Sequence, residues 1–436
     1  MKRILLFGAG KSATVLIDYL KKTASENHWE VTVADSHLET VLLKTGGHPS
    51  LIPLQINITD EARRKELIAK ADIVISMMPP ALHYLVALDC IAFKKHLLTA
   101  SYIDENIRQL ANSIRDKGIF FLCEMGLDPG IDHMSAMKLV EGVKAKGGMI
   151  NLFKSHCGGL VAPESDDNPW HYKISWNPAS VALAGKAGAV YKENNEIKKI
   201  AYHDVFKDHG KVDVPKMGMY EWYANRDSLS YLSLYGMEAT ATFMRTTLRA
   251  QGFCNGWQQV IELKLTNEEK IYQSDGLSVA DFFLQHFEKN NFSQVLDLIN
   301  SNPLLQKQFE CLGLNDHTTI INKGLCSAAD VLQFLLETKL PLRPTDKDMI
   351  IMLHEIEYSI NGRSSKISSS LVVKGEDNLR TAMAKTVGLP LGIAAKLILE
   401  GKINETGLHI PVMASIYEPV LKELEENGIV FEETEE

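Results

Sequence analysis

No cysteine or histidine pattern typical of a metal site or a disulfide framework occurs in this sequence. The six cysteines are scattered along the chain without a CxxC pair, and the fourteen histidines show no HExxH spacing. Isolated cysteines of this kind are typical of reduced thiols in a reducing compartment. We therefore expect a cytoplasmic protein without structural disulfides and without a metal centre.

Long apolar runs, a leader peptide and an excess of basic residues are absent too. No run reaches transmembrane length, and Met1 leads directly into the first predicted strand rather than into a signal peptide. The formal net charge of −9 argues against nucleic acid or an anionic membrane as the main partner. We therefore expect the chain to bind a small molecule, with no nucleic acid and no membrane as partner.

The chain opens with a pattern that predicts a dinucleotide-binding turn. Residues 4–7 are all apolar, which predicts a strand buried on both faces, and Gly8, Gly10 and Ala13 follow with the spacing G-x-G-x-x-A. Gly8 permits the tight turn, Gly10 lets the backbone approach a pyrophosphate, and Ala13 lets the following helix pack closely on the strand. The alternative is a structural glycine turn that binds nothing.

Asp35 predicts which dinucleotide this turn binds. It ends a second predicted strand, residues 31–34, where a carboxylate can accept hydrogen bonds from the ribose hydroxyls. The 2′-phosphate of NADP would add negative charge beside it, and no arginine follows directly. We therefore favour NAD as the cofactor over NADP. Lys11 and Ser12, which lie inside the turn, complete this group of cofactor-binding candidates.

Strands and helices continue to alternate through the first third of the chain. The predicted strands cover residues 54–58, 73–76, 96–100 and 119–123, and the predicted helices cover residues 60–71, 81–92 and 104–116. This alternation predicts an α/β fold with a Rossmann-type, doubly wound parallel sheet, whose ligands bind beyond the carboxyl ends of the strands. Ser76, which ends one of these strands, is a further cofactor-binding candidate.

The remaining chain predicts a second, larger α+β domain. At 436 residues the chain exceeds one compact core, and from about residue 150 strand-like pieces such as 181–184 are separated by long loops. We expect a mainly antiparallel sheet that serves substrate binding and dimerisation, in a homodimer, and a helix over 378–399 interrupted at Pro390. The predicted domains are 1–125 for dinucleotide binding, 126–276 with 341–389 for the substrate, and 277–340 for a helical subdomain.

Four polar, glycine-rich and aromatic stretches carry the functional signal of the second part. They are CEMGLDPGIDHM at 123–134, SHCGGLVAPESDDNPWHYKISWNP at 155–178, NRDSLSYLSLYG at 225–236 and RTTLRAQGFCNGW at 245–257. Together they resemble the saccharopine dehydrogenase/reductase family, in the lineage with the glycine-rich strand at the N-terminus. Ala224 and Thr246 depart from the family pattern, which has a proline and a glycine at these positions.

The resemblance implies an activity, a cofactor and a set of contacts. Members of the family interconvert saccharopine with glutamate and 2-aminoadipate 6-semialdehyde by means of NAD or NADP. The resemblance also implies that residues 390–436 complete the dinucleotide-binding domain. By resemblance, the cofactor contacts Leu127, Asp128, Pro129, Gly130 and Trp176, and the substrate contacts Ser101, Tyr102, Arg226, Thr247 and Arg249.

The carboxylates of such a substrate match the arginines in these stretches. Saccharopine is a secondary amine with three carboxylates, and arginine is the side chain that pairs with a carboxylate through two parallel hydrogen bonds. Arg226, Arg245 and Arg249 are therefore the carboxylate-binding candidates. We predict hydride transfer between the nicotinamide and the carbon that bears the amine.

A proton must also move at the amine nitrogen. Asp128 is the first candidate for this role, with Tyr102 or Cys157 as alternatives. Two other functions remain open at this stage: a related C–N oxidoreductase that acts on a polyamine conjugate such as carboxynorspermidine, and a non-catalytic NAD-binding protein. The arginine candidates favour a substrate with several carboxylates over a polyamine.

Overall fold

The computed structural model covers residues 1–436, which fold into two units. Unit 1 consists of Met1–Gly147 and Leu379–Val430, and unit 2 consists of Gly148–Asn378 and Phe431–Glu436. The sequence placed the first boundary near residue 125, but the helix that follows it stays with unit 1. The sequence also assigned the whole chain end to the first domain, but Phe431–Glu436 lies in unit 2 because its strand pairs there.

Unit 1 is built on a seven-stranded, entirely parallel sheet in the order β18-β6-β5-β4-β1-β2-β3. Its central strands are buried along almost their whole length, as expected when helices cover both faces of a sheet. This arrangement confirms the predicted Rossmann-type fold. The strands are β1 (Arg3–Phe7), β2 (Glu30–Asp35), β3 (Leu51–Gln55), β4 (Ile73–Ser76), β5 (His96–Thr99), β6 (Phe120–Leu122) and β18 (Gly407–His409).

Polar side chains cap the first turn of some helices of unit 1. Asp60 accepts a hydrogen bond from the backbone N–H of Arg63, and Asp104 accepts one from Ile107. The helix predicted over 104–116 is broken at Leu110 into two short helices. The helices are η1 (Lys11–Ala13), α1 (Thr14–Asn27), α2 (Leu38–Thr45), α3 (Glu61–Lys70), α4 (Pro80–Phe93), α5 (Glu105–Gln109), α6 (Ala111–Asp116), α7 (Ile131–Ala145), α14 (Ala382–Leu399) and α15 (Ala414–Glu426).

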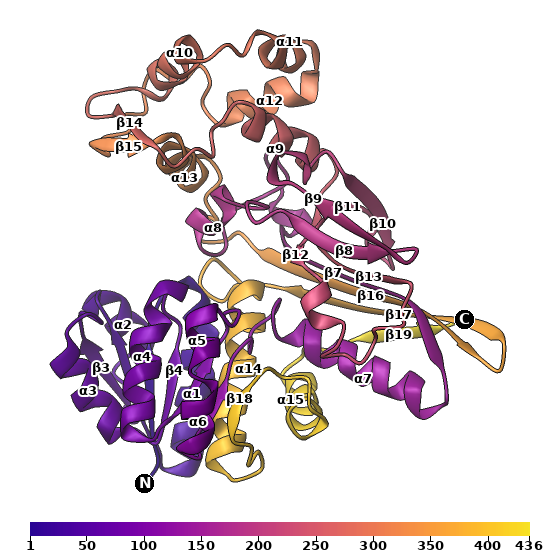
Figure 1. Ribbon diagram of the computed structural model, residues 1–436. Helices are drawn as coiled ribbons and strands as arrows, with labels where there is room; N and C mark the ends of the chain where they lie inside the picture. Colours follow the sequence, from indigo (N-terminus) through magenta and orange to yellow (C-terminus); the bar gives the residue numbers. More distant parts are fainter. The chain divides into compact units, whose positions relative to one another are not determined.

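Helix α14, from the last part of the chain, packs against α1, and Figure 1 shows it in yellow beside the indigo N-terminal elements. Two glycines permit this close approach. A Cβ added at Gly388 would lie 3.0 Å from the Cβ of Leu16, and one at Gly392 would lie 2.6 Å from the ring of Tyr19. Burial of both sides of the helix offsets the hydrogen bond lost at Pro390, so the helix continues where an interruption was predicted.

Helix α14 also corrects the expectation that no segment could cross a membrane. It is long and apolar enough by length and composition, but 72% of its most apolar window is buried inside the structure. Its residues between Ala382 and Leu397 belong to the core of unit 1, where α14 also contacts α15 and β4. A helix buried in a protein core needs the same apolar composition as a membrane-spanning helix, which explains the length and composition of α14.

Unit 2 contains a ten-stranded sheet, of which seven strands follow the order β10-β11-β13-β7-β16-β17-β19. Most neighbours are antiparallel as predicted, but β13 and β7 pair in parallel, as do β12 and β8. The strands are β7 (Met149–Val161), β8 (Ala189–Glu193), β9 (Glu196–Ile200), β10 (His209–Val214), β11 (Gly218–Ala224), β12 (Arg226–Asp227), β13 (Thr242–Arg249), β16 (Asp348–Ile360), β17 (Arg363–Lys374) and β19 (Glu432–Glu435).

The helices of unit 2 gather mainly at one end, where Figure 1 shows α10 to α13 together. They share an aromatic core that includes Trp170, Trp257 and Phe282. The strand predicted at 181–184 is wrong, because Asn177 caps the N–H of Ala179 and starts α8 instead. The helices are η2 (Pro163–Ser165), α8 (Pro178–Ala182), η3 (Tyr202–Asp204), η4 (Leu229–Tyr231), α9 (Phe253–Glu262), α10 (Val279–Lys289), α11 (Ser293–Ser301), α12 (Pro303–Cys311) and α13 (Ala328–Lys339), with a small hairpin of β14 (Lys270–Gln273) and β15 (Leu325–Ser327).

Candidate active site

The glycine turn after β1 has the geometry that a dinucleotide pyrophosphate needs. Gly8 has a φ of +99°, and a Cβ there would lie 2.9 Å from the carbonyl oxygen of Met77, so only glycine fits. A Cβ at Gly10 would meet no atom within 4 Å, which leaves open space beside this backbone. Ala13 is buried at the end of η1. The residues present therefore fit the pyrophosphate of a nicotinamide dinucleotide.

Lys11 and Ser12, the two remaining candidates in this turn, lie in η1. Lys11 is exposed and Ser12 is half-buried. No side chain caps the start of η1. Lys11 and Ser12 are its first two residues, and backbone N–H groups at this position can bind phosphate oxygens.

Asp35 is fixed by backbone donors at the end of β2. Its Oδ2 accepts a hydrogen bond of 2.7 Å from the N–H of Ala9, and its Oδ1 accepts one of 3.0 Å from the N–H of His37. Burial acts to raise the pKa of Asp35, but these hydrogen bonds outweigh it and hold the pKa below its usual value. The carboxylate is therefore ionised beside the glycine turn.

Lys44 is a further charged group at this turn that the sequence did not indicate. Its Nζ, on α2, donates a hydrogen bond of 2.6 Å to the carbonyl oxygen of Gly10. Burial lowers the pKa of Lys44 to about 8, while the charges of Asp35 and Asp18 act in the opposite direction. No sequence spacing links this lysine to the glycines, so only the packing of α2 against the turn identifies it.

Ser76 and Ser101, predicted separately, are joined by a histidine that the sequence analysis missed. Nδ1 of His83 is 2.9 Å from the hydroxyl oxygen of Ser76, and Nε2 is 2.9 Å from that of Ser101. The two serines stand at the carboxyl ends of the neighbouring strands β4 and β5. The signal available in the sequence was one imidazole inside a mostly apolar helix that begins four residues after Ser76.

The two leading proton-transfer candidates of unit 1 contact each other. The hydroxyl of Tyr102 donates a hydrogen bond of 3.1 Å to Oδ1 of Asp128, and both side chains are partly exposed. Asp128 lies in the turn formed by Leu127, Pro129 and Gly130, the predicted cofactor-contacting residues. A Cβ at Gly130 would lie 2.1 Å from the carbonyl oxygen of Gly126, so the turn closes only with glycine there.

A buried charged cluster supports this turn, and it too was missed. Nε2 of His133 is 2.9 Å from Oε2 of Glu124, and Oδ1 of Asp132 accepts a hydrogen bond of 2.6 Å from the N–H of Gly130. The other oxygen of Glu124 accepts a hydrogen bond of 3.1 Å from the N–H of Ile103, directly after Tyr102. The cluster therefore connects the segments that carry Tyr102 and Asp128.

Strand β13 of unit 2 presents Arg245, Thr247 and Arg249 on one face, because alternate residues of a strand point to the same side. Cys157 of β7 is the register partner of Thr247, so it lies on this face as well. Thr246 points to the other face, where its hydroxyl lies 2.6 Å from Nδ1 of the buried His156. This contact gives the buried hydroxyl of Thr246 a partner at the position where the resemblance predicts a glycine.

Arg249 is a buried cation without a carboxylate partner. It is 5% exposed, and its guanidinium lies 5.2 Å from the ring centroid of Phe253, 5.3 Å from that of Tyr172 and 5.6 Å from that of Tyr223. It donates hydrogen bonds to the carbonyl oxygen of Leu248 and to the hydroxyl of Tyr223, but its Nε has no partner. Such a group fits an anion that the chain itself does not supply.

The other two arginines and Trp176 occupy different environments in unit 2. Arg245 is buried, with its guanidinium 4.6 Å from the ring centroid of Tyr231, whereas Arg226 is exposed at the start of β12. Trp176 is half-buried against the aromatic core, and its Nε1 donates to the hydroxyl of Tyr172, 3.2 Å away. Unit 2 thus contains Cys157, Trp176, Arg226, Arg245, Thr247 and Arg249, and unit 1 contains all the other predicted site residues.

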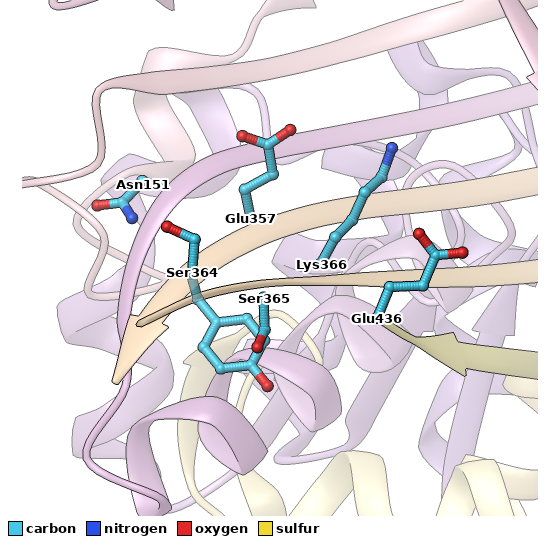
Figure 2. Close-up of a pocket in the computed structure, with 7 residues that line it drawn as sticks. Asn151, Glu357, Ser364, Ser365, Lys366 and Glu436 are labelled. Atoms are coloured by element: carbon cyan, nitrogen blue, oxygen red, sulfur yellow. The ribbon is translucent and has the colours of Figure 1, made fainter. Parts of the chain in front are cut away.

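A separate cavity in unit 2 contains none of the predicted residues. It has a volume of about 260 Å³ and lies at the hairpin between β16 and β17, next to the C-terminal Glu436 (Figure 2). The residues that line it are Asn151, Glu357, Tyr358, Ser364, Ser365, Lys366 and Glu436. The cavity does not coincide with the side chains predicted to bind the cofactor or the substrate.

Comparison with known proteins finds two matching family models that together cover nearly the whole chain. Residues 4–122 match the saccharopine dehydrogenase NADP binding domain, and residues 126–429 match the saccharopine dehydrogenase C-terminal domain. Among solved structures, the apo saccharopine dehydrogenase (L-Glu forming) from Saccharomyces cerevisiae matches with a TM-score of 0.88 and 30% sequence identity, covering 100% of both chains.

Curated relatives are similar along the whole chain. The alpha-aminoadipic semialdehyde synthase of Arabidopsis thaliana is 32% identical over 98% of this chain, which spans 44% of that relative. The chain thus spans about half the length of the first curated relatives it matches. The Saccharomyces cerevisiae protein named saccharopine dehydrogenase [NADP(+), L-glutamate-forming] is 32% identical, with 99% of both chains covered.

Proposed function

This chain belongs to the saccharopine dehydrogenase family, and we propose that it interconverts saccharopine with L-glutamate and 2-aminoadipate 6-semialdehyde. A nicotinamide dinucleotide supplies hydride exchange at the carbon that bears the secondary amine. The glycine turn after β1 holds the pyrophosphate, and Asp35 holds the ribose at the end of β2. The homodimer and the cytoplasmic location predicted from the sequence stay predictions.

The single observation that carries this proposal is the buried guanidinium of Arg249, which has no carboxylate partner. A buried cation without a counter-charge is costly, and a ligand carboxylate would offset that cost. Saccharopine brings three carboxylates, whereas a polyamine conjugate brings additional cations that this environment would repel. The aromatic rings around Arg249 exclude water and so strengthen its attraction for an anion.

Asp128 is our proposed proton acceptor at the amine nitrogen. Its carboxylate is partly exposed at the carboxyl edge of the sheet and receives a hydrogen bond from Tyr102, which fixes its orientation. The geometry favours Asp128 over Cys157, because Asp128 is the partly exposed candidate that contacts Tyr102. Tyr102, in direct contact with Asp128, is the remaining alternative.

A steady-state assay tests the proposed reaction. The protein is mixed with NAD or NADP and either saccharopine or carboxynorspermidine, and formation of the reduced cofactor is followed by absorbance. We expect turnover with saccharopine only, because saccharopine has three carboxylates for the arginine candidates, whereas carboxynorspermidine has one carboxylate and additional cationic amines. Turnover with carboxynorspermidine alone would contradict the substrate, and calorimetric binding of NADH without turnover of either compound would favour a non-catalytic role.

For the cofactor, the matching family model and the name of the yeast relative both specify NADP. From Asp35 we propose that this chain nevertheless prefers NAD(H) over NADP(H). The ionised carboxylate of Asp35 would repel a 2′-phosphate by up to about 4 kcal/mol at 4 Å and an effective dielectric constant of about 20. Exchange of Asp35 for serine is expected to raise kcat/KM with NADP by at least roughly 10-fold. A native enzyme that already uses NADP better than NAD would contradict this assignment.

A further inference from the structure

A buried histidine connects the carboxyl ends of two neighbouring strands in unit 1. His83 lies in the first turn of α4 and is 4% exposed, and its two ring nitrogens contact the hydroxyls of Ser76 and Ser101. Ser76 is the last residue of β4, and Ser101 follows β5, its parallel neighbour in the sheet. This connection lies at the edge of the sheet where ligands bind in folds of this class.

The ring can satisfy both contacts only in a definite pattern of donors and acceptors. Burial lowers the pKa of His83 to about 4, and the charge of Asp104, at the start of α5, acts in the opposite direction without overcoming it. A neutral imidazole has one N–H donor and one acceptor nitrogen. One serine must therefore donate its hydroxyl proton to the ring, and the other serine must accept the proton of the ring.

The burial of Ser76 decides which serine donates. Ser76 is 1% exposed, and its hydroxyl has no hydrogen-bond partner other than His83. If Nδ1 carried the proton, the hydroxyl proton of Ser76 would have no acceptor in a site closed to water, which is costly. If Nε2 carries the proton, Ser76 donates to Nδ1 and the ring donates to Ser101, so every buried proton is satisfied.

Ser101 then has one hydroxyl proton left for a ligand. Its side chain is half-buried, and its oxygen already accepts from Nε2 of His83. We infer that Ser76 locks His83 in the Nε2–H form and that His83 thereby makes Ser101 a hydrogen-bond donor to an oxygen acceptor of the bound ligand. This inference rests on the proposed function, in which the acceptor is a carboxylate of the substrate or the carboxamide oxygen of the cofactor. His83 is a positioning residue, because it acts through Ser101.

The protonation pattern can be measured without any activity assay. Two-dimensional ¹H–¹⁵N spectra of protein labelled with ¹⁵N-histidine report which ring nitrogen carries the proton, and the His83→Gln variant assigns the signal by its loss. We expect a neutral Nε2–H ring from pH 5.5 to 8, and a mixture of both forms in Ser76→Ala. An Nδ1–H ring, or a ring that becomes charged near pH 6.5, would overturn the inference whether or not saccharopine is the substrate.

Kinetic and binding measurements on variants distinguish whether Ser101 donates its hydrogen bond to the substrate or to the cofactor. Ser101→Ala and His83→Phe are each expected to weaken binding by about 10-fold with little change in kcat, as for one lost hydrogen bond. A raised KM for saccharopine identifies a substrate carboxylate, and a raised Kd for the dinucleotide, measured by calorimetry, identifies the cofactor. His83→Gln, whose amide N–H can reach Ser101, should recover most of the loss. Unchanged binding in Ser101→Ala, or His83→Gln as weak as His83→Phe, would overturn the role of Ser101 as a donor.

Discussion

Replacement of Arg249 by methionine is expected to raise the KM for saccharopine by about 100-fold, which corresponds to the loss of about 2.7 kcal/mol from a charge-assisted pair. The free energy of unfolding should change by no more than about 1 kcal/mol, because the variant also removes a buried cation that no carboxylate balances. Part of that gain is cancelled by the lost contacts with the surrounding rings. Steady-state kinetics and urea denaturation measure the two effects.

Arg64 provides the matched control, because it is equally buried but paired. It is 5% exposed, its Nε lies 2.7 Å from Oδ2 of Asp89, and its NH1 donates to the carbonyl oxygen of Ile58. Arg64→Met should cost about 3–5 kcal/mol of stability, since it leaves Asp89 buried and uncompensated, while the KM for saccharopine stays the same. An Arg249→Met enzyme with normal KM and a loss of stability like that of Arg64→Met would show that Arg249 is structural.

The Asp128→Asn variant is expected to lower kcat by roughly 100- to 10,000-fold, the usual contribution of a general base. The side chain keeps its size and can still accept the hydrogen bond from Tyr102, so the turn should keep its conformation. The amide cannot take a proton from the amine at any pH. Protonation of the carboxylate should lower kcat of the native enzyme toward acid pH, and we expect this decrease to be absent in the variant.

Tyr102→Phe separates this role from that of the neighbouring hydroxyl. The variant removes the hydrogen bond of 3.1 Å to Asp128 and keeps the carboxylate, so kcat should decrease by about 10-fold or less and the acid decrease should persist. If Tyr102→Phe abolishes the pH dependence and Asp128→Asn retains it, the tyrosine is the proton-transfer group. Affinity for NADH, measured by calorimetry in both variants, checks that the cofactor turn is intact.

Local patterns in the sequence were sufficient for the dinucleotide fold. The apolar run of β1, the glycine spacing and the acid at the end of β2 each depend on neighbours in sequence, and the structure places all of them as these rules require. The error at α8 has the same local origin, because Asn177 and Pro178 are helix-start signals that outweigh the β-propensity of Val181.

The environment of each candidate side chain could not be predicted in this way. The alternation of β13 indicates that Arg245, Thr247 and Arg249 share a face, but not that the last of them is buried among aromatic rings contributed by distant segments. His83 illustrates the same limit, since it is near Ser76 in sequence, whereas its second partner comes from another strand. Lys44 reaches Gly10 only because α2 packs beside the glycine turn.

The sequence by itself determined the class of fold, the position of the cofactor turn and the family, because these follow from periodicity, spacing and short motifs along the chain. Only the tertiary structure decided which arginine lacks a counter-charge, which histidine joins two strand ends and which strands of the second sheet run parallel. The physical reason is that burial and hydrogen-bond satisfaction depend on segments far apart in the chain, whose approach no local pattern specifies.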